Sequence, residues 1–451
     1  MIQFGSVWVT PGSSPGFRHG VHPPENKELT EHLPIRRLPY PAEVVIPLRQ
    51  HTGKPARAVV RAGQHVERGD VIAEADGFVS VPMHASAAGR VVEVGLWPHP
   101  DGSWSPAVRI AVDPFSAQIE RPRLVPAWEP LTPKEVGAAI QQAGLVGLGG
   151  AAFPTHVKLA PPPDVTLDTL VVNGCECEPY LTTDHRTMVE YAERVHMGVR
   201  ILLKALGVSR ALIGVERNKP DAIAALQRTR PADLPVEVVP LEVKYPQGAE
   251  KMLIKTLLGR EVPSGKLPMH VGVVVQNVGS VATVAEVFET RLPLVERIVT
   301  VTGRGVRQPA NLIVPIGTKL RDLLEACGGL APDAGEVIFG GPMMGVAQAS
   351  LDVPVLKGTT GVVVLSRDDV KVQEQHPCIR CGRCIEACPM LLNPQMLGRL
   401  AKAGKYEDMP AYHLADCVLC GCCSYACPSN IPLPQLFVAA RGALRKQQAS
   451  A

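Results

Sequence analysis

Eight of the twelve cysteines in this sequence fall into two runs of the same spacing. The runs are CIRCGRCIEACP (378–389) and CVLCGCCSYACP (417–428), and each cysteine of the first run has a counterpart 39 residues later. Within a run, two, two and three residues separate the four cysteines that have counterparts, and a proline follows the last one; Cys422 is an additional cysteine of the second run. Soft thiolate ligands at this spacing can hold three corners of a [4Fe-4S] cluster from one loop. We therefore predict two iron–sulfur clusters, which pass electrons one at a time.

The fourth cysteine of each run is expected to complete the other cluster, as in two-cluster folds. The two predicted ligand sets are Cys378, Cys381, Cys384 and Cys427 for the first cluster, and Cys417, Cys420, Cys423 and Cys388 for the second. A pair of zinc knuckles is the alternative, but zinc ligands usually come as CxxC pairs or together with histidine. Cys422 is out of register with this spacing, so we predict that it is not a ligand. The sequence assigns no role to Cys327.

A glycine-rich stretch, GLVGLGGAAFPTHVK (144–158), is the second candidate for chemistry. Backbone without a Cβ atom can approach a flat ring or a phosphate closely, and consecutive N–H groups can cradle anionic oxygens. Lys158, near the end of the stretch, could supply a positive charge. Such a loop is a weak signal when it stands alone, and an ordinary tight connection is an equally good interpretation.

A third stretch, VVNGCECEPYLTTDH (171–185), places Cys175 and Cys177 among acidic residues directly after a predicted buried strand. Two thiols supply only half of a tetrahedral metal site. A disulfide between residues two apart would strain the loop, and cysteines in a chain without a secretion signal indicate a reducing compartment. We predict that neither thiol binds metal or forms a disulfide, and that this stretch lines a site whose chemistry belongs to another group.

Composition narrows the possible functions. The 451 residues are 46% hydrophobic and 20% charged, which is typical of a globular protein of several domains. Aromatic residues make up only 4%, and the 46 basic and 43 acidic side chains are well mixed, so we expect no nucleic-acid partner. The N-terminus does not resemble a secretion signal, and no apolar stretch reaches the roughly 18 residues of a membrane-spanning helix. Membrane association is expected only through partners.

The distribution of apolar residues and turns predicts a multidomain chain of α/β and β modules. The expected divisions are an extended arm (1–40), a barrel-sandwich (41–120), a proline-rich linker (121–131), an α/β domain (132–290), a β-grasp-like unit (297–350) and a cluster-binding domain (370–440). The barrel-sandwich resembles the biotinyl and lipoyl carrier domains, whose hairpin presents a modified lysine. Its hairpin tip, Ala75 to Phe78, contains no lysine, so we predict a structural role.

The α/β domain begins with a clear helix signal. Thr132 and Glu135 can form a capping box, Pro133 suits the first helical position, and the helix should stop at Gly144. Strands and helices alternate beyond it, which indicates a parallel sheet with helices on its faces. The predicted strands are 169–173, 211–216 and 236–242, and the predicted helices are 186–206 and 220–229.

The glycine-rich stretch resembles the flavin loop of the NADH-binding flavoprotein subunit of respiratory complex I, whose pattern is GxxGxGGAGFPTGxK. The matching residues are Gly144, Gly147, Gly149, Gly150, Ala151, Phe153, Pro154, Thr155 and Lys158, while Ala152 and His156 stand at glycine positions. That family continues with Asn-Ala-Asp-Glu-x-Glu-Pro, where this chain has residues 173–179 and Cys175 replaces the first acid. The stretch VVQNVGSVATV (274–284) is similar to its VNNVETL. In YPQGAEKMLIKTLLGR (245–260), Glu250 matches the first acid of its Gly-Glu-Glu-Thr-Ala-Leu segment and Lys251 replaces the second.

This resemblance implies a Rossmann-like domain that binds FMN and uses NADH. The residues that it places around the cofactors are Gly147, Gly149, Gly150, Phe153, Lys158, Asn173, Glu176, Glu178, Glu250, Gln276 and Asn277. The glycines would admit the flavin ring and phosphate, Lys158 would pair with the phosphate, and Asn173 and the two acids that follow it would hydrogen-bond flavin or nicotinamide. A solvated helix face is the alternative for Glu250 and Lys251.

The order of the modules resembles the RnfC family of the Rnf electron-transport complex more than complex I. The phrases FRHGVHPPENK (17–27), ECEPYLTTDHRTM (176–188) and PCIRCGRCIEACP (377–389) are similar to that family. The resemblance implies a β-grasp unit of the SLBB type and a two-cluster ferredoxin domain. It also implies a peripheral subunit on the cytoplasmic face of the inner membrane, which transfers electrons between NADH, FMN and two [4Fe-4S] clusters for ion-translocating partner subunits.

Two alternatives stay open at the level of sequence. A ferredoxin-like electron bridge, whose α/β domain binds no nucleotide, is favoured by the departures at Cys175 and Lys251. A cobalamin reductase would share the flavin-type and ferredoxin parts, but the N-terminal position of the barrel-sandwich favours the Rnf type. The sequence leaves open the coupling ion, the direction of electron flow, the accepting subunit and any redox-regulator client.

Overall fold

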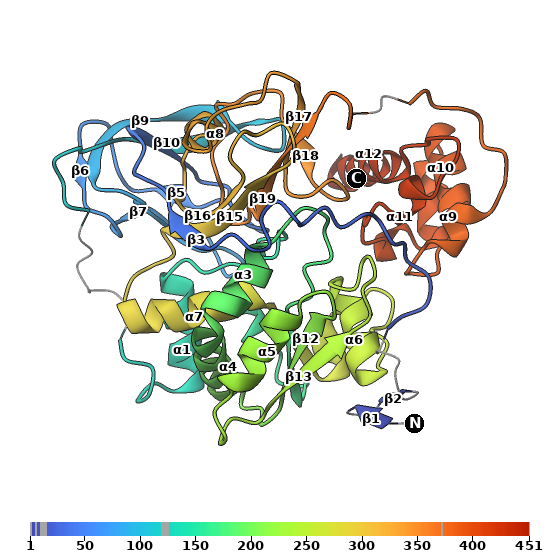
Figure 1. Cartoon of the computed structure of the whole chain (residues 1–451), viewed down its shortest axis with the longest axis horizontal. Helices are drawn as coiled ribbons and strands as arrows, with labels where there is room; N and C mark the ends of the chain where they lie inside the picture. Colours follow the sequence, from blue (N-terminus) through green and yellow to red (C-terminus); the bar gives the residue numbers. More distant parts are fainter. Residues whose placement is uncertain (1, 5–6, 10–15, 119–125, 371–372, 451) are drawn as a thin grey trace.

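The computed structural model describes residues 2–4, 7–9, 16–118, 126–370 and 373–450. Residues 121–125 of the predicted linker lie outside these ranges. Within them the modules follow one another in the predicted order, with the cluster domain at one end of the molecule (Figure 1). Two short strands, β1 (Ile2–Phe4) and β2 (Val7–Val9), pair near the N-terminus. No helix in the described part of the chain is long and apolar enough to span a bilayer.

The barrel-sandwich consists of two small sheets with strand orders β4-β10-β9-β6 and β5-β7-β8. Its strands are β4 (Glu43–Pro47), β5 (Arg57–Ala58), β6 (His65–Val66), β7 (Val71–Glu74), β8 (Met83–His84), β9 (Gly89–Pro98) and β10 (Trp104–Val112). The loop between β7 and β8 contains the predicted hairpin tip. There, Phe78 lies edge-on to His156 with ring centroids 5.6 Å apart, and its carbonyl oxygen is 2.8 Å from His156 Nε2. The tip is therefore anchored to the α/β domain.

The α/β domain contains a four-stranded parallel sheet in the order β13-β12-β11-β14. The strands are β11 (Thr169–Asn173), β12 (Ala211–Glu216), β13 (Val236–Leu241) and β14 (Val273–Asn277). The flanking helices are α1 (Pro133–Gln142), α2 (Thr155–Lys158), α3 (Thr183–Glu190), α4 (Ala192–Leu206), α5 (Pro220–Arg228), α6 (Glu250–Leu258), η1 (Pro268–Val271) and α7 (Val278–Thr290). The capping box at Thr132 and the helix end before Gly144 are confirmed.

The single helix predicted over 186–206 is wrong, because the structure has two helices there. The backbone leaves the helical region at Tyr191, with φ −124° and ψ 31°. Both helices contact α5 and α7, but α3 packs mainly on α5, whereas α4 packs mainly on α7 and also reaches α1. Apolar periodicity continues across the break and therefore could not reveal it.

The third module is built on a six-stranded sheet in the order β18-β17-β19-β15-β16-β3. Its elements are β3 (Ile35–Arg37), β15 (Glu296–Thr302), β16 (Ala310–Pro315), α8 (Leu320–Ala326), β17 (Ala334–Phe339), β18 (Val346–Ala347) and β19 (Gly361–Ser366). The sheet thus extends past 297–350: β3 comes from the N-terminal arm and pairs in parallel with β16, and β19 lies between β17 and β15.

The cluster domain is a structural repeat as well as a sequence repeat. Its elements are α9 (Arg383–Glu386), α10 (Pro394–Lys402), η2 (Tyr406–Tyr412), η3 (Leu414–Asp416), α11 (Cys422–Tyr425) and α12 (Leu433–Ser450). Helices α9 and α11 begin 39 residues apart, as do α10 and α12. The left-handed residues Arg380 and Leu419, with φ of 58° and 56°, keep the same offset. The two halves therefore share one backbone path.

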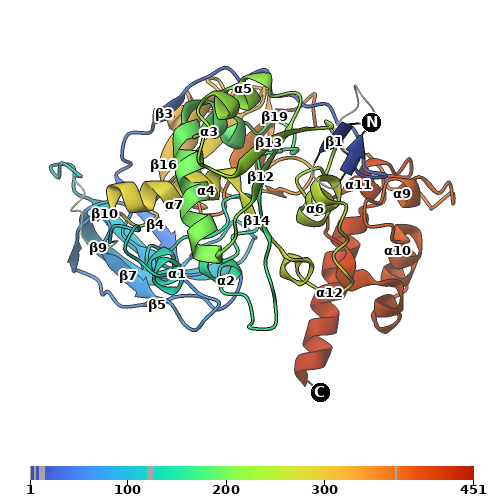
Figure 2. The ribbon, with the colours of Figure 1, turned by 90° about the horizontal axis from the view of Figure 1, so that it is seen from below.

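The N-terminal arm runs between the modules (Figures 1 and 2). Val21 forms an isolated antiparallel bridge with Tyr245. Lys27 is buried, and its Nζ donates hydrogen bonds to the carbonyl oxygens of three residues in the loop 176–181. Burial lowers the pKa of Lys27. Further on, β3 completes the third module. Residues 21–37 of the arm therefore contact several modules and connect them.

Candidate functional site

The carboxyl ends of β11 and β14 meet at the centre of the α/β sheet. The chain runs from β11 outward through β12 to β13, whereas β14 lies on the opposite side of β11. Asn173 and Asn277, the last residues of the two strands, are partners in the register. In open α/β sheets, ligands bind in the crevice at such a reversal of strand order. The sheet therefore brings two of the predicted site residues to the place where such a ligand would bind, which we call the crevice.

The glycine-rich loop lies against this crevice. Gly147 N–H donates to the carbonyl of Phe153 at 2.8 Å, which closes the loop on itself, and Leu148 N–H donates to Ser280 Oγ at 2.7 Å. A Cβ atom at Gly149 would lie 3.2 Å from the side chain of Asn277, so a larger residue would crowd that side chain at the end of β14. Gly149 and Gly150 are exposed. The loop presents bare backbone beside the strand ends, as a site for a flat ring or phosphate requires.

Lys158 and Glu250 form an ion pair at the edge of the crevice. Lys158 Nζ lies 2.6 Å from Glu250 Oε2 and 3.0 Å from the carbonyl oxygen of Val275 in β14. The two side chains are partly exposed, at 27% and 36%. Glu250 is the first residue of α6, where a negative charge is favourable. The predicted phosphate partner and the predicted dinucleotide-facing acid are thus brought together.

Gln276 is the predicted site residue with the least complete set of partners. Its side chain is buried, and its Nε2 atom has no hydrogen-bond partner among the described residues. A buried, unsatisfied amide costs about 1–3 kcal/mol. By contrast, Asn173 Nδ2 donates to the carbonyl of Gly248 at 2.8 Å. The unpaired donor at the end of β14, together with the bare glycine loop, fits a ligand rich in acceptor oxygens and nitrogens, as FMN is.

Glu176 does not point freely into the crevice. Its Oε1 accepts from Thr183 Oγ at 3.0 Å and from Asp184 N–H at 2.7 Å, and its Oε2 accepts from His185 N–H at 3.0 Å. The carboxylate therefore caps the start of α3, where it satisfies backbone donors and complements the helix dipole. Direct contact between Glu176 and a flavin stays a prediction, and its structural role is one that the sequence did not indicate.

Glu178 joins the α/β domain to the SLBB-type module. Its Oε1 accepts from the backbone N–H groups of Met343 and Met344 at 2.6 and 3.0 Å. Burial raises the pKa of Glu178, whereas these hydrogen bonds act in the opposite direction. Glu178 therefore faces the loop after β17, and contact between its side chain and nicotinamide stays a prediction.

The two cysteines of this loop are packed and protonated. Cys175 is fully buried in an apolar cluster with β12 and α6, and burial raises the pKa of its thiol. Burial also raises the pKa of Cys177, whose sulfur accepts a hydrogen bond from Gly248 N–H at 3.4 Å. Both are free thiols. That neither thiol binds metal or forms a disulfide stays a prediction.

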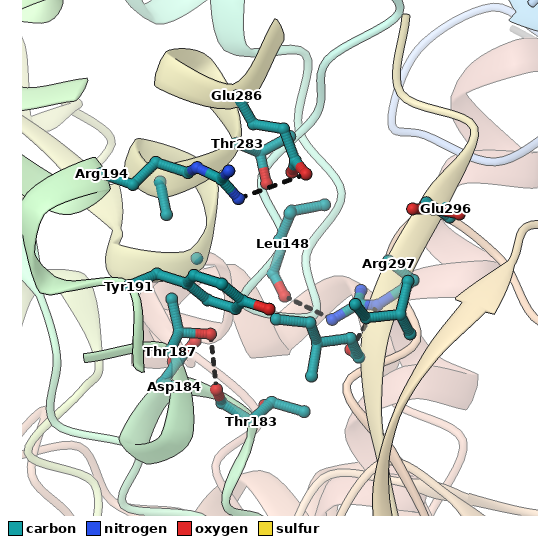
Figure 3. Close-up of a pocket in the computed structure, with 14 residues that line it drawn as sticks. Leu148, Thr183, Asp184, Thr187, Tyr191, Arg194, Thr283, Glu286, Glu296 and Arg297 are labelled. Atoms are coloured by element: carbon teal, nitrogen blue, oxygen red, sulfur yellow. Dashed lines mark hydrogen bonds and ion pairs between the residues drawn. The ribbon is translucent and has the colours of Figure 1, made fainter. Parts of the chain in front are cut away.

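Behind the glycine loop lies a cavity of about 60 Å³ between α3, α4, α7 and the strands β15 and β16 (Figure 3). Arg297 lines this cavity and donates to the carbonyl oxygens of Leu148 and Lys357 at 3.4 and 2.6 Å. Asp184 is buried at its inner end and accepts from Asn277 Nδ2 at 2.6 Å. Burial, together with the neighbouring charge of Glu176, raises the pKa of Asp184 to about 7. Arg297 therefore holds the glycine loop from behind, and Asp184 holds Asn277 at the end of β14.

Sequence reasoning missed Asp184, Arg297 and Lys27. Asp184 and Lys27 stand within stretches that resemble a known family, but no spacing rule identifies a side chain that acts through a neighbour. Arg297 comes from the next module, so that only the folded chain brings it to the glycine loop.

The predicted ligands of the second cluster line one small cavity. Cys388, Cys417, Cys420 and Cys423 all line it, together with apolar residues that include Phe437. Burial raises the pKa of Cys423, and the nearby Cys420, Cys417 and Cys388 raise it further. Thiols crowded together in an apolar pocket are unfavourable as bare thiolates and favourable as ligands of a cationic cluster. The four residues fit such a cluster.

The four predicted ligands of the first cluster also lie close together, at the outer end of the domain. Burial raises the pKa of Cys384, and the nearby Cys427, Cys381 and Cys378 add to that effect. Cys378 and Cys381 are exposed. This site is therefore closer to solvent than the second one.

Cys422 and Cys327 lie outside both sets. Cys422 also lines the cavity of the second set, and its thiol is hydrogen-bonded to Cys420. It is fully buried, with its sulfur 4.0 Å from the carbonyl oxygen of Tyr245, and that it is not a ligand stays a prediction. Cys327 is buried in the core of the SLBB-type module. Burial raises its pKa to about 11. Its surroundings are those of an ordinary apolar core residue.

Comparisons with known proteins agree with this architecture. Four family models match the chain: the RnfC barrel sandwich hybrid domain at 15–114, the Nuo51 FMN-binding domain at 140–286, the SLBB domain at 298–347 and the 4Fe-4S dicluster domain at 377–431. The C subunit of the proton-translocating ferredoxin:NAD(+) oxidoreductase complex of Clostridium ljungdahlii is 46% identical over 401 residues, which cover 89% of this chain and 88% of that protein. The chain belongs to the RnfC family.

Two further relatives extend the match. The C subunit of the Na(+)-translocating ferredoxin:NAD(+) oxidoreductase complex of Acetobacterium woodii is 43% identical over 400 residues, or 89% of this chain and 90% of that protein. The C subunit of the ion-translocating oxidoreductase complex of Rhodobacter capsulatus is 41% identical over 444 residues, or 97% and 85%. RnfC membership confirms the expected multidomain fold and the expected function as the C subunit of an ion-translocating oxidoreductase complex. It favours that interpretation over a cobalamin reductase.

Proposed function

We propose that this chain binds FMN in the crevice between β11 and β14 and exchanges electrons between NADH and two [4Fe-4S] clusters. It would do so as a peripheral subunit on the cytoplasmic face of the inner membrane. The relatives belong to complexes named for ferredoxin, NAD(+) and proton or sodium translocation, and we propose the same class of reaction for this complex. When bound, FMN would take up two electrons with a hydride and release them one at a time.

The side chains around the crevice would bind and orient the cofactor. Gly149 and Gly150 would leave room for the ring and the phosphate, and the unpaired Nε2 of Gln276 would donate to the flavin. Lys158 would exchange its ion pair with Glu250 for the phosphate. Phe153, which is half-buried beside the loop, would pack against the dinucleotide.

We propose the eight cysteines of the two gathered sets as cluster ligands, with the second cluster nearer the flavin. The segment from Tyr245 to Gly248 carries this proposal. Tyr245 Oη donates to the carbonyl of Cys420 at 2.7 Å, and the carbonyl of Gly248 accepts from Asn173 at 2.8 Å. The Cα atoms of Tyr245 and Gly248 are three steps apart along the chain, which is about 11 Å at most. A cluster held by Cys420 would therefore lie close to the flavin crevice, and the cluster at Cys378 would follow it.

A second candidate function is the ferredoxin-like electron bridge, in which the α/β domain binds no nucleotide. One observation favours it: Lys158 and Glu176 already have protein partners in the crevice. An amide such as Gln276 could remain unpaired at a small cost, and the α/β domain would then serve only to dock the ferredoxin domain.

Anaerobic purification separates the two candidates. We expect iron for two clusters, bound or readily reconstituted FMN, and bleaching of the visible spectrum on addition of NADH. Lys158→Met should lower FMN retention without loss of iron, whereas Lys134→Met, at an exposed position of α1, should change neither. Full iron without FMN after reconstitution, and without any response to NADH, would leave the bridge as the function.

A further inference from the structure

The glycine loop is bound from behind by the SLBB-type module. Arg297, in β15, donates from Nη2 to the carbonyl oxygen of Leu148 at 3.4 Å (Figure 3), and Lys357, between β18 and β19, donates from Nζ to the carbonyl oxygen of Gly144 at 2.7 Å. The two basic residues are themselves joined, because Arg297 Nη1 donates to the carbonyl oxygen of Lys357 at 2.6 Å. One part of the SLBB-type module therefore supports the loop at two places.

The hydrogen bond from Arg297 sets the direction of the next N–H group in the loop. The carbonyl of Leu148 and the N–H of Gly149 belong to the same planar trans peptide, in which they point in opposite directions. Since the carbonyl faces Arg297, the N–H of Gly149 points away from it. A Cβ atom at Gly149 would lie 3.2 Å from the side chain of Asn277, so this peptide borders the crevice. Arg297 thus orients a backbone donor beside the proposed flavin site.

The support is closely packed around Lys357. A Cβ atom at Gly358 would lie 3.0 Å from the Cβ atom of Ala152 and 3.3 Å from the carbonyl oxygen of Gly150. A Cβ atom at Gly144, whose φ is +71°, would lie 2.6 Å from Lys357 Nζ. The turn at 357–358 therefore leaves little room between the glycine loop and the SLBB-type module.

Arg297 carries a buried charge that its hydrogen-bond partners do not cancel. The residue is 6% exposed, and its Nε donates to the carbonyl oxygen of Ile298 at 3.0 Å, so that these partners, like the carbonyls of Leu148 and Lys357, are neutral. Burial lowers the pKa of Arg297 to about 10, against the influence of Asp184, which leaves the guanidinium charged at neutral pH. Asp184 has a pKa of about 7 and is therefore partly protonated there.

The carboxylates along the same cavity have cations of their own. Glu286 lies 3.4 Å from Arg194, and Glu296 forms an ion pair with Arg68. Burying a charge without a carboxylate of its own is costly, and groups held in this way are candidates for a functional role. The charge of Arg297 is therefore available to an anionic group on the other side of the glycine loop.

We propose that Arg297 is a positioning residue of the flavin site, which orients the peptide between Leu148 and Gly149 and places a buried positive charge behind it. The inference rests on the proposed function, because it takes FMN as the ligand of the crevice. Hydride transfer from NADH brings two electrons and one proton, NADH leaves as NAD(+), and the crevice gains one negative charge. A cation behind the loop stabilises that charge, and so raises both the affinity for FMN and its midpoint potential.

Equilibrium binding of FMN tests the affinity. The iron-loaded chain is freed of FMN and titrated under argon, with quenching of FMN fluorescence as the signal. Arg297→Gln should raise the dissociation constant at least about tenfold, because a hydrogen bond to a charged group and a buried charge are lost together. Arg304→Gln, 75% exposed in the same module, should leave it unchanged. Equal affinity of wild type and Arg297→Gln would overturn the proposal.

The midpoint potential separates the charge from the shape of the loop. A redox titration at the flavin absorption band, with the FMN-free chain subtracted, should place Arg297→Gln at least about 30 mV below wild type, a tenfold change in equilibrium constant for two electrons. Arg297→Lys keeps the charge but cannot reach three carbonyl oxygens together, so its potential should fall by less than half as much. An equal fall in both variants would overturn the proposal, because altered loop geometry would then explain it.

Gly358→Ala tests the support of the loop without a change of charge, and it does so even if Arg297→Gln fails to fold. The added methyl group would press on Ala152, so FMN affinity should fall at least about threefold with unchanged iron. Gly442→Ala, whose Cβ meets no described atom within 4 Å, is the matched control. Unchanged affinity in Gly358→Ala would also overturn the proposal. A wild-type chain that binds no FMN would contradict the proposed function, and this inference with it.

Discussion

Replacing Asp184 with asparagine should stabilise the chain at neutral and alkaline pH and have no effect in acid. The carboxyl group is buried behind the glycine loop, and burial raises its pKa from 3.8 to about 7. Asn277 donates to it, and the charges of Arg297 and Lys219 oppose the rise. The introduced side-chain amide would keep an oxygen for the hydrogen bond from Asn277. The substitution therefore removes the ionisation and preserves the contact.

The direction in which stability changes with pH follows from the number of protons bound by the folded and the unfolded chain. Between about pH 4 and 7 the folded chain retains a proton on Asp184 that the unfolded chain has released, so that stability falls as the pH rises through this window and then levels off. A shift of about 3 pKa units corresponds to about 4 kcal/mol, which is the upper limit of the gain for Asp184→Asn at pH 8. For a domain of this size the gain is about 2–4 °C in melting temperature per kcal/mol.

Thermal unfolding of the iron-loaded chain under argon, followed by circular dichroism from pH 4 to 9, measures the effect. The wild-type melting temperature should decline towards pH 7 more steeply than that of Asp184→Asn, and the two curves should converge near pH 4. Asp164→Asn, at an exposed position, is the matched control and should follow the wild type. Parallel curves for wild type and Asp184→Asn would refute a buried ionisation. An equal gain at every pH would indicate a packing effect instead.

Further substitutions around the crevice separate structure from cofactor binding. Cys175→Ser and Cys177→Ser should both keep the iron of two clusters, since neither thiol is in a gathered set; iron loss measured in either variant would make that cysteine a ligand. Glu176→Gln should slow NADH oxidation with unchanged iron, because an amide replaces one of the two oxygens that cap α3, and normal rates would remove Glu176 from the site. Gly149→Val should lower FMN content because it crowds Asn277 at the end of β14. Gly137→Ala, whose Cβ meets no described neighbour, should retain FMN.

The sequence predicted those parts of the molecule that depend on local spacing. Two runs of cysteines specify two gathered sets, because each run is one short loop and one turn of helix. The capping box at Thr132 and the alternation of strands and helices likewise depend on neighbours in the chain. The family resemblance added the glycine loop and the ends of β11 and β14, which the parallel register then brings together.

The remaining features depend on contacts that no local pattern encodes. Glu176 and Glu178 were expected beside a cofactor, but the structure turns one to the start of α3 and the other to Met343 and Met344. Each of these hydrogen bonds forms only because α3, or the loop after β17, packs beside the carboxylate. The break at Tyr191 and the strand that the arm adds to the third sheet are of the same kind. They follow from tertiary packing, which overrides apolar periodicity.

The N-terminal arm has a consequence for how the chain is made. The arm is synthesised before its partners: Lys27 needs the carbonyls of 176–181, and β3 needs β16. Until they emerge from the ribosome, the arm has no surface on which to fold. The arm is thus translated before its partners but folds after them, and its contact with the cluster domain, where the Ala387 carbonyl accepts from Gly20 N–H, forms last.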